Sequence, residues 1–491
     1  MSAESYLPII YVRGYAALQS EVNATVDDPF YGFNLGSTHV RVDAKGDPAQ
    51  FFFESPLVRL LTDYGYRDVF EGATQAVFAA LADKLKTIWI FRYYDETADT
   101  YGQAGRRWSI EEAAGRLREF IRDVKKQTGA PKVHLVAHSM GGLVCRSLLQ
   151  KIYPDAKEAG PDHVARFATY GTPHGGIQFR TGLGFLERIR DAIGAMNSDD
   201  FGLERMYQYL TPKKETAKKV PKGFEPNAID PDVFDPDNIF CLIGTNARDY
   251  DVAAGGAKTA VGPQSDGLVQ IGAAYVKGSH RAYVHRSHSG RYGIVNSEEG
   301  FQNLERFLFG DLQAIVNLEG VKDLPGSGEE SYQVDVRVSV RGLPVFMNEQ
   351  TREHFCPIIL NDDDKPVPMH PVFTQFLISS RSPDGSTARF AVNLAVKRLR
   401  MKGGEVDYDG MLHGVPTWTD TLIADVRLSA EPAVFTRWSL ADGDIEPLAR
   451  VVKLQRSGAW RVVIPLPDGK ARELLGEKAV LAIDAHAWTL D

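Results

Sequence analysis

Residues 133–144 read VHLVAHSMGGLV, an apolar run that breaks at His-Ser-Met and two glycines before it becomes apolar again. The pattern predicts a buried strand that ends at Ser139 and a helix that begins directly after it. A turn this tight brings together the residues two before and two after the serine, so both must be small; here they are Ala137 and Gly141. This strand-turn-helix elbow lifts a serine hydroxyl clear of the backbone, at a helix N-terminus that favours negative charge. A short match of this kind also fits a helix start that is merely capped by serine.

The composition limits the classes of protein to which this chain can belong. The chain has 491 residues, of which 43% are hydrophobic and 24% charged, so it is long enough for more than one globular domain. Its net charge of −8 argues against a nucleic-acid partner. The three cysteines, Cys145, Cys241 and Cys356, are far apart in apolar contexts and predict buried free thiols. Without a signal-like segment or a long apolar run, we expect a cytoplasmic protein, although export by another route stays open.

Two patterns divide the chain near residue 325. Before it, short apolar runs alternate with helical patterns, and one helix begins with a capping box, Ser109 to Glu112. This alternation predicts a mostly parallel sheet covered by helices on both faces. The expected strands are 6–12, 87–94, 132–138, 164–170 and 238–244, and a closing helix is expected from 296 to 308.

After a polar, glycine-bearing linker at 320–331, apolar and polar residues alternate with a period of two. This period is typical of half-buried strands, and their spacing predicts a β-sandwich. The expected strands are 332–340, 372–379, 388–396, 421–429, 448–455, 460–466 and 478–486. We therefore predict a first domain over 1–322, with insertions at about 17–70 and 177–237, and an all-β domain over 330–491 that supplies no catalytic group.

A serine hydroxyl needs a base to take its proton, and the base needs an acid to orient it. In an elbow of this type the acid and then the histidine follow the serine along the chain. Asp266 stands before a glycine in GPQSDGLVQ, and His288 lies in the glycine-flanked loop YVHRSHSGRYG. We predict that these two residues complete a triad with Ser139. Competing candidates are His280, His285, Asp249 and Asp251.

A developing oxyanion needs two backbone N–H donors. The residue after the serine, Met140, is the first candidate. The second donor should come from the loop after the strand at 9–12, where Arg13-Gly14-Tyr15 follows. We predict the N–H of Tyr15, because Gly14 lets the backbone turn toward the serine. An ordinary strand-ending turn at Gly14 is the alternative.

Together these segments resemble the lipase and esterase branch of the α/β-hydrolases. The carriers are IIYVRGYA (9–16), VHLVAHSMGGLV (133–144), FATYGTPHGG (167–176), SDGLV (265–269) and SHSG (287–290). YYDE at 93–96 is similar to a Tyr-Asp segment of acyltransferase-like hydrolases of this fold. The resemblance covers about residues 6–310 and implies an α/β-hydrolase fold and ester hydrolysis through an acyl-enzyme. Arg13 departs from the histidine that many lipases place before this glycine.

The predicted function is a serine carboxylic-ester hydrolase that cleaves acyl esters. A phospholipase or acyltransferase would use the same triad, a serine peptidase would keep the fold, and a non-catalytic binding protein would rely on the β-domain. We expect an acyl-ester or lipid substrate, with transient contact to a lipid surface left open, and neither cofactor nor metal; calcium near the His288 loop has no sequence support. An apolar stripe from Leu183 to Met196 could form a lid or a permanently packed helix. His174 is expected to line the pocket, and 213–222 to be a solvated loop.

Overall fold

The computed structural model describes most of the chain. The described residues are 6–16, 19–42, 45–69, 81, 83–99, 108–177, 201–217, 219–249, 262–290, 293–324, 330–360, 369–381, 387–402, 405–406, 416–427, 433–439, 451–453 and 460–490. The chain divides into two compact units, the first formed by 1–281 and 286–304 and the second by 282–285 and 305–491. Each unit is described by itself.

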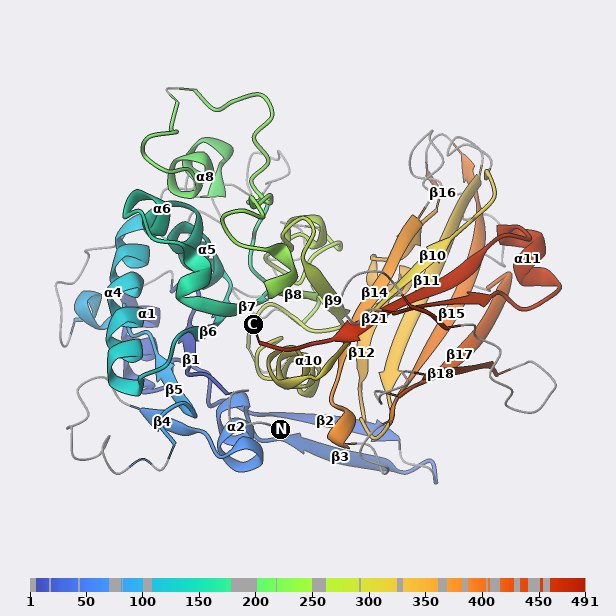
Figure 1. Cartoon of the computed structure of the whole chain (residues 1–491), viewed down its shortest axis with the longest axis horizontal. Helices are drawn as coiled ribbons and strands as arrows, with labels where there is room; N and C mark the ends of the chain where they lie inside the picture. The colour runs from blue at the N-terminus through green and yellow to red at the C-terminus, as the bar shows by residue number, and fades with distance from the viewer. Residues whose placement is uncertain are drawn as a thin grey trace. The chain divides into compact units, whose positions relative to one another are not determined.

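The first unit is built on a sheet in the order β4-β5-β1-β6-β7-β8-β9 (Figure 1), and of β9 only residues 280 and 281 belong to this unit. Neighbouring strands from β4 to β8 run parallel. The bounds are β1 Ile9–Val12, β4 Arg67–Val69, β5 Thr87–Ile90, β6 Val133–His138, β7 Val164–Tyr170, β8 Ile239–Gly244 and β9 His280–Val284. β1, β5 and β8 are buried along their whole length, which is why they read as continuous apolar runs in the sequence. The predicted mostly parallel sheet is confirmed.

Helices flank this sheet at positions that local sequence signals mark. α4 (Ile110–Thr128) begins at the predicted capping box, where the Ser109 hydroxyl accepts from the Glu112 N–H and the Glu112 carboxylate accepts from the Ser109 N–H. It ends at Gly129, whose φ of 75° is left-handed. α5 (Met140–Ser147) lies beside α4 and continues through a π-helical turn at Leu148–Ile152 into α6 (Tyr153–Asp155). α10 (Glu298–Phe309) is the predicted closing helix.

The two insertions carry structure of their own. The stretch 17–70 holds α1 (Gln19–Asp27), a hairpin of β2 (Ser37–Val42) and β3 (Pro48–Phe53), and α2 (Pro56–Tyr64), besides β4. In 177–237, α8 (Leu203–Leu210) is followed by an exposed loop, as predicted for 213–222. The apolar stripe proposed as a lid, Leu183 to Met196, lies outside the described residues.

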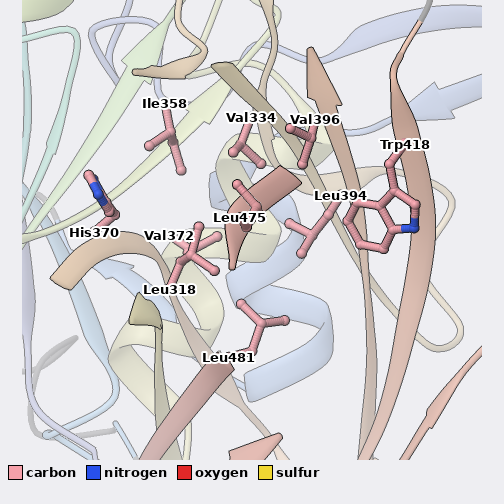
Figure 2. Close-up of a pocket in the computed structure, with 10 residues that line it drawn as sticks. All are labelled: Leu318, Val334, Ile358, His370, Val372, Leu394, Val396, Trp418, Leu475 and Leu481. Carbon is pink, nitrogen blue, oxygen red and sulfur yellow. The ribbon is translucent and has the colours of Figure 1, made fainter. Parts of the chain in front are cut away.

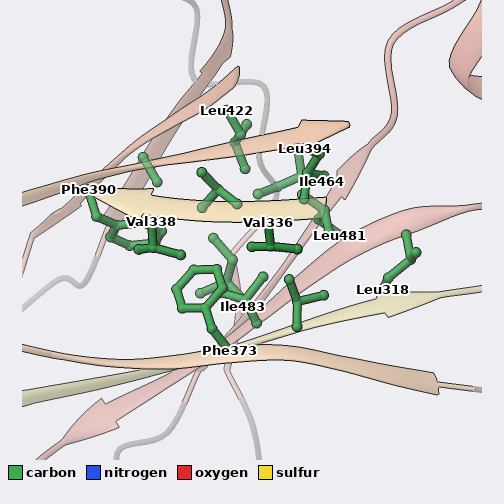
Figure 3. Close-up of a cluster of buried hydrophobic side chains, with 14 of the residues drawn as sticks. Leu318, Val336, Val338, Phe373, Phe390, Leu394, Leu422, Ile464, Leu481 and Ile483 are labelled. Atoms are coloured by element: carbon green, nitrogen blue, oxygen red, sulfur yellow. The ribbon is translucent and has the colours of Figure 1, made fainter. Parts of the chain in front are cut away.

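The second unit consists of antiparallel sheets with interlocking apolar faces, which fits the predicted β-sandwich. One sheet has the order β14-β10-β21-β20-β19 and another the order β12-β11-β15-β17-β18, to which β13 and β16 are attached. Figure 3 shows the aliphatic and phenylalanine side chains that meet between them. The bounds are β10 Leu312–Glu319, β11 Glu330–Val340, β12 Phe346–Gln350, β13 Ile358–Ile359, β14 Met369–Leu377, β15 Thr387–Lys402, β16 Glu405–Val406, β17 Trp418–Arg427, β18 Ala433–Trp438, β19 Val451–Lys453, β20 Trp460–Pro465 and β21 Val480–Ala487, with α11 at Lys470–Leu475.

The division between the units falls earlier than the sequence indicated. β10 belongs to a sheet of the second unit, where it pairs antiparallel with β14 and β21. The expected first domain, 1–322, therefore includes a strand that the second unit uses. The polar composition of 320–331 does not tell which sheet the preceding strand joins.

A small apolar pocket lies inside the second unit (Figure 2). Most of its lining comes from strands of both sandwich sheets, and His370 adds an imidazole that is buried. Burial lowers the pKa of His370, so its ring stays neutral near pH 7. The lining residues are Leu318, Val334, Ile358, His370, Val372, Leu394, Val396, Trp418, Leu475 and Leu481.

Cys145, Cys241 and Cys356 are buried free thiols, as predicted. Burial raises the pKa of Cys356 to about 12 and that of Cys145 further, so both remain protonated thiols. Among the described helices, none combines the length and the apolar character needed to cross a bilayer.

Candidate active site

Ser139 occupies the turn between β6 and α5 with a backbone that serine rarely adopts. Its φ of 53° and ψ of −131° lie in a strained region for a residue with a side chain. Two contacts from the end of β7 hold it there. The Ser139 N–H donates to the Tyr170 carbonyl at 2.9 Å, and the Thr172 hydroxyl donates to the Ser139 carbonyl at 2.8 Å. The surrounding sheet thus fixes the serine in its strained turn.

The small residues on either side of Ser139 are both buried. A Cβ on Gly141 would lie 2.3 Å from the Val12 carbonyl oxygen and 2.6 Å from that of Arg13. The sequence predicts a small residue at 141 because positions 137 and 141 approach each other. In the structure, the end of β1 also requires glycine at 141, because no side chain fits against its carbonyl groups.

His288 links Ser139 to Asp266 through two short hydrogen bonds. The His288 Nε2 lies 2.9 Å from the Ser139 Oγ, and its Nδ1 lies 2.8 Å from the Asp266 Oδ2. A carboxylate only accepts hydrogen bonds, so the proton belongs on Nδ1 and leaves Nε2 to accept from the serine hydroxyl. All three side chains are more than nine-tenths buried. The arrangement has the order of groups that activates a serine nucleophile.

The Asp266 carboxylate is itself fixed by its own loop. Its Oδ1 accepts from the N–H groups of Leu268 at 3.0 Å and Val269 at 2.7 Å, which leaves Oδ2 for His288. The two loops are also tied through the backbone, because the His288 N–H donates to the Asp266 carbonyl at 2.8 Å. The side chains of Asp266 and His288 are therefore fixed relative to each other by their own loops.

His138, the residue before the serine, contacts the histidine loop. Its Nε2 lies 2.9 Å from the His288 carbonyl oxygen, and the two imidazole rings are 4.9 Å apart. Burial, with the nearby His288 ring, holds the pKa of His138 well below its usual range. A neutral His138 with its proton on Nε2 donates to this carbonyl, so it anchors the loop without adding charge to the site.

Gly171 lies directly behind the acid–histidine pair. Its φ is +52°, and a Cβ there would lie 2.8 Å from the Asp266 Oδ2 and 3.1 Å from the His288 Nδ1. Both numbers are shorter than ordinary contacts, so any side chain at 171 would push the two groups apart.

Gly171→Ala is therefore expected to lower kcat for the proposed ester hydrolysis by about 10- to 100-fold, because catalytic groups tolerate little displacement. Gly65→Ala is the matched control: Gly65 has φ +71° with nothing within 4 Å of its Cβ position. An alanine at positive φ costs about 1–2 kcal/mol of stability, which both variants carry. Melting curves and ester kinetics on both separate the two effects. Equal kcat values in the two variants would contradict the prediction that a side chain at 171 displaces Asp266 and His288.

The predicted oxyanion donors lie close to the serine. Met140 is buried and is the first residue of α5. On the other side, a Cβ on Gly14 would lie 2.4 Å from the Ser139 Cβ and 3.2 Å from its Oγ. The segment that contains Tyr15 therefore passes directly beside the hydroxyl. The donor roles of the Tyr15 and Met140 N–H groups remain predictions.

The competing acids and histidines have other surroundings. Asp249 is exposed, and its Oδ2 accepts from the Asn246 Nδ2 at 2.6 Å, while Asp251 lies outside the described residues. The His280 Nε2 lies 3.6 Å from Asp237, and the His285 ring stacks on His354 with ring centroids 3.8 Å apart.

His174, expected to line the pocket, is fully buried, with its Nε2 3.1 Å from the Thr169 hydroxyl.

Across the described ranges, no group of three or more His, Cys, Asp or Glu side chains is arranged to hold a metal ion.

Ser139, Asp266 and His288 stand out in the sequence, whereas the groups that hold them do not. Thr172 stands in the quoted GTPHGG segment and His138 in the quoted elbow. Both side chains bond to backbone carbonyl groups, so the sequence alone carries no signal for their partners. Gly171 could have been noticed as the first glycine of GTPHGG, although its contact with the acid depends on the folded sheet.

Residues 100–190 match the family described as the alpha/beta hydrolase fold. Among solved structures, the mature lipase BlEst2 of Bacillus licheniformis is 16% identical; the match covers 62% of this chain and 91% of that one, with a TM-score of 0.33. Phospholipase PlaB of Legionella pneumophila is 12% identical, covering 82% and 91%, with a TM-score of 0.35. A putative cell surface hydrolase of Lactobacillus plantarum is 13% identical, covering 62% and 90%, with a TM-score of 0.25.

The parallel strands and flanking helices of the first unit define an α/β protein in which a serine stands between a central strand and its helix. The residues that match the family model, 100–190, include this serine, and the sheet and helices of the first unit fit an α/β-hydrolase fold.

Proposed function

We propose that this protein is a serine carboxylic-ester hydrolase that cleaves acyl esters through an acyl-enzyme. The observation that carries the proposal is the buried chain of hydrogen bonds from the Ser139 hydroxyl through His288 to Asp266. A serine that is merely a helix cap needs no such base. In this structure the Ser139 side chain makes no capping hydrogen bond to α5.

The first half of the reaction forms the acyl-enzyme. The Ser139 Oγ attacks the ester carbonyl carbon while the His288 Nε2 takes the hydroxyl proton, and Asp266 stabilises the imidazolium that results. The carbonyl oxygen becomes an oxyanion, and in this proposal it accepts hydrogen bonds from the N–H groups of Met140 and Tyr15. The carbon–oxygen bond to the alcohol then breaks, and the leaving oxygen takes the proton from His288.

The second half releases the acid. A water molecule gives a proton to His288 and attacks the acyl carbon, and the bond to the Ser139 Oγ breaks as the serine regains its proton. An alcohol in place of water would give acyl transfer by the same steps. The triad accommodates both, so the acceptor must be determined by assay.

The direct test uses purified full-length protein, p-nitrophenyl esters from acetate to palmitate, and a fluorophosphonate probe. We expect saturable ester hydrolysis and a single covalent phosphonyl adduct located on Ser139 by peptide mass spectrometry. The dependence on chain length separates short-chain esterase from lipase activity, and a phospholipid arm tests the phospholipase alternative. A folded protein that neither hydrolyses any of these esters nor reacts with the probe would contradict the proposal.

A further inference from the structure

The segment after β5 is not used by the chemistry above, although its sequence, YYDE, stood out. Tyr93 and Tyr94 are both buried. Their hydroxyl groups bond to the backbone of residues 13–16, the loop that passes beside Ser139. We name residues 13–16 the oxyanion loop, because they include the predicted donor, Tyr15.

The Tyr94 hydroxyl makes two hydrogen bonds to this loop. It donates to the Gly14 carbonyl at 3.1 Å and accepts from the Ala16 N–H at 2.9 Å. Its single proton and an acceptor lone pair are both engaged with the loop backbone. The neighbouring Tyr93 hydroxyl donates to the Arg13 carbonyl at 2.9 Å. The two tyrosines therefore hold consecutive backbone groups of the oxyanion loop.

Peptide geometry carries this contact to the predicted donor. The Gly14 carbonyl and the Tyr15 N–H belong to the same peptide group, which is planar and trans. Fixing the direction of the carbonyl therefore fixes the direction of the N–H on the opposite side. The bond to Ala16 fixes the following peptide as well. Donation to the Gly14 carbonyl also polarises the peptide, which strengthens its N–H as a donor.

We propose that Tyr94 is a positioning residue for ester hydrolysis: its hydroxyl clamps the peptides on both sides of Tyr15 and so aims the Tyr15 N–H at the oxyanion. The inference rests on the proposed function and specifies how its transition state is stabilised. Glycine at 14 is needed for the loop to pass Ser139 without a clash, but glycine adds conformational freedom. The Tyr94 hydroxyl removes that freedom where the geometry of a hydrogen-bond donor matters.

Hydrogen bonds from Tyr31 and Arg92 to Asp95 hold the YYDE segment (93–96) in place. The Tyr31 hydroxyl donates to the Asp95 Oδ1 at 2.6 Å, and the Arg92 Nε lies 2.9 Å from the Asp95 Oδ2. Arg92 also donates to carbonyl groups of residues 26, 28 and 29. Burial raises the pKa of Tyr93 well above its usual range, so this phenol stays a donor at working pH.

The test compares Tyr94→Phe with Tyr66→Phe in the full-length protein. Each change removes one buried phenol hydroxyl that donates to a backbone carbonyl and keeps the ring, but only the first removes a bond to the oxyanion loop, because the Tyr66 hydroxyl donates to the Leu7 carbonyl. We expect Tyr94→Phe to lower kcat by about 10- to 100-fold, below the full loss of an oxyanion donor, with KM nearly unchanged. Tyr66→Phe should lose comparable stability and keep kcat within about threefold.

A transition-state analogue gives a readout that a structural role would not move. A boronic acid adds to the Ser139 Oγ and places an oxygen where the oxyanion forms, so its Ki should rise in Tyr94→Phe by the factor that kcat/KM falls. Fluorophosphonate titration normalises both numbers to folded active sites. If the parent reacts with the probe but Tyr94→Phe matches Tyr66→Phe in kcat and Ki, this inference is overturned. If the parent shows neither turnover nor labelling, the proposed function itself fails.

Discussion

Ser139→Ala is expected to lower kcat for ester hydrolysis by about 10⁴-fold or more, because loss of the nucleophile removes the acyl-enzyme route. The fold should persist, since the Ser139 backbone is held by Tyr170 and Thr172 and not by its own side chain. The variant should therefore melt near the parent and fail to react with a fluorophosphonate.

Ser147→Ala provides the matched control. Ser147 is fully buried on α5, and the described residues offer its Oγ no hydrogen-bond partner. The same loss of one hydroxyl there should leave kcat within about threefold, as expected for a change that removes no interaction at the site. If Ser139→Ala keeps activity within tenfold of the parent while melting unchanged, the nucleophile has been misassigned.

Asp266→Asn is expected to lower kcat by up to about 10⁴-fold, because an amide of the same shape can hold the imidazole in the wrong tautomer. In the parent, the Asp266 Oδ2 accepts from the His288 Nδ1 at 2.8 Å. An asparagine can turn its NH₂ toward that nitrogen, so the proton moves to Nε2 and His288 can no longer act as the base. Such a change acts on turnover more than on substrate affinity.

Asp249→Asn is the comparison for Asp266→Asn, because Asp249 also follows β8 but is exposed and bonded to Asn246. Its substitution should change kcat by less than about tenfold, since it alters only a screened surface charge. Measuring both on a short-chain ester, with Asp251→Asn alongside, decides the acid. A silent Asp266→Asn together with a collapse in either of the others would reassign it.

Much of the first unit could be predicted because its central strands are largely buried. β6 and β8 read as apolar runs, and the capping box at Ser109 marks where α4 begins. The expected order of the three groups along the chain then reduced the number of candidate acids and histidines, because few candidates lie in predicted loops after Ser139. The structure brings Asp266 and His288 together with Ser139 from loops that follow different strands.

The supporting contacts could not be predicted, for a physical reason. Thr172, His138 and Tyr94 all bond to backbone carbonyl groups, which every residue carries and which therefore leave no pattern in the sequence. The partners of Thr172 and Tyr94 become neighbours because the sheet places β5, β1, β6 and β7 side by side, and the partner of His138 lies in the loop after β9. In the second unit, β12 (FMNEQ) was not predicted, because an alternating apolar pattern is weak in so short a strand.

The pairing of β10 with β21 has a consequence for how the protein is produced. Residues 312–319 pair with residues 480–487 along their whole length, and β21 in turn pairs with β20. Contacts between segments so distant along the chain form slowly, because a long loop must close before any pairing is gained. During synthesis β14 is made well before β21, so the edge of β10 that pairs with β21 stays unpaired for longer and is open to pairing with other chains. Slow expression at low temperature is expected to raise the soluble yield.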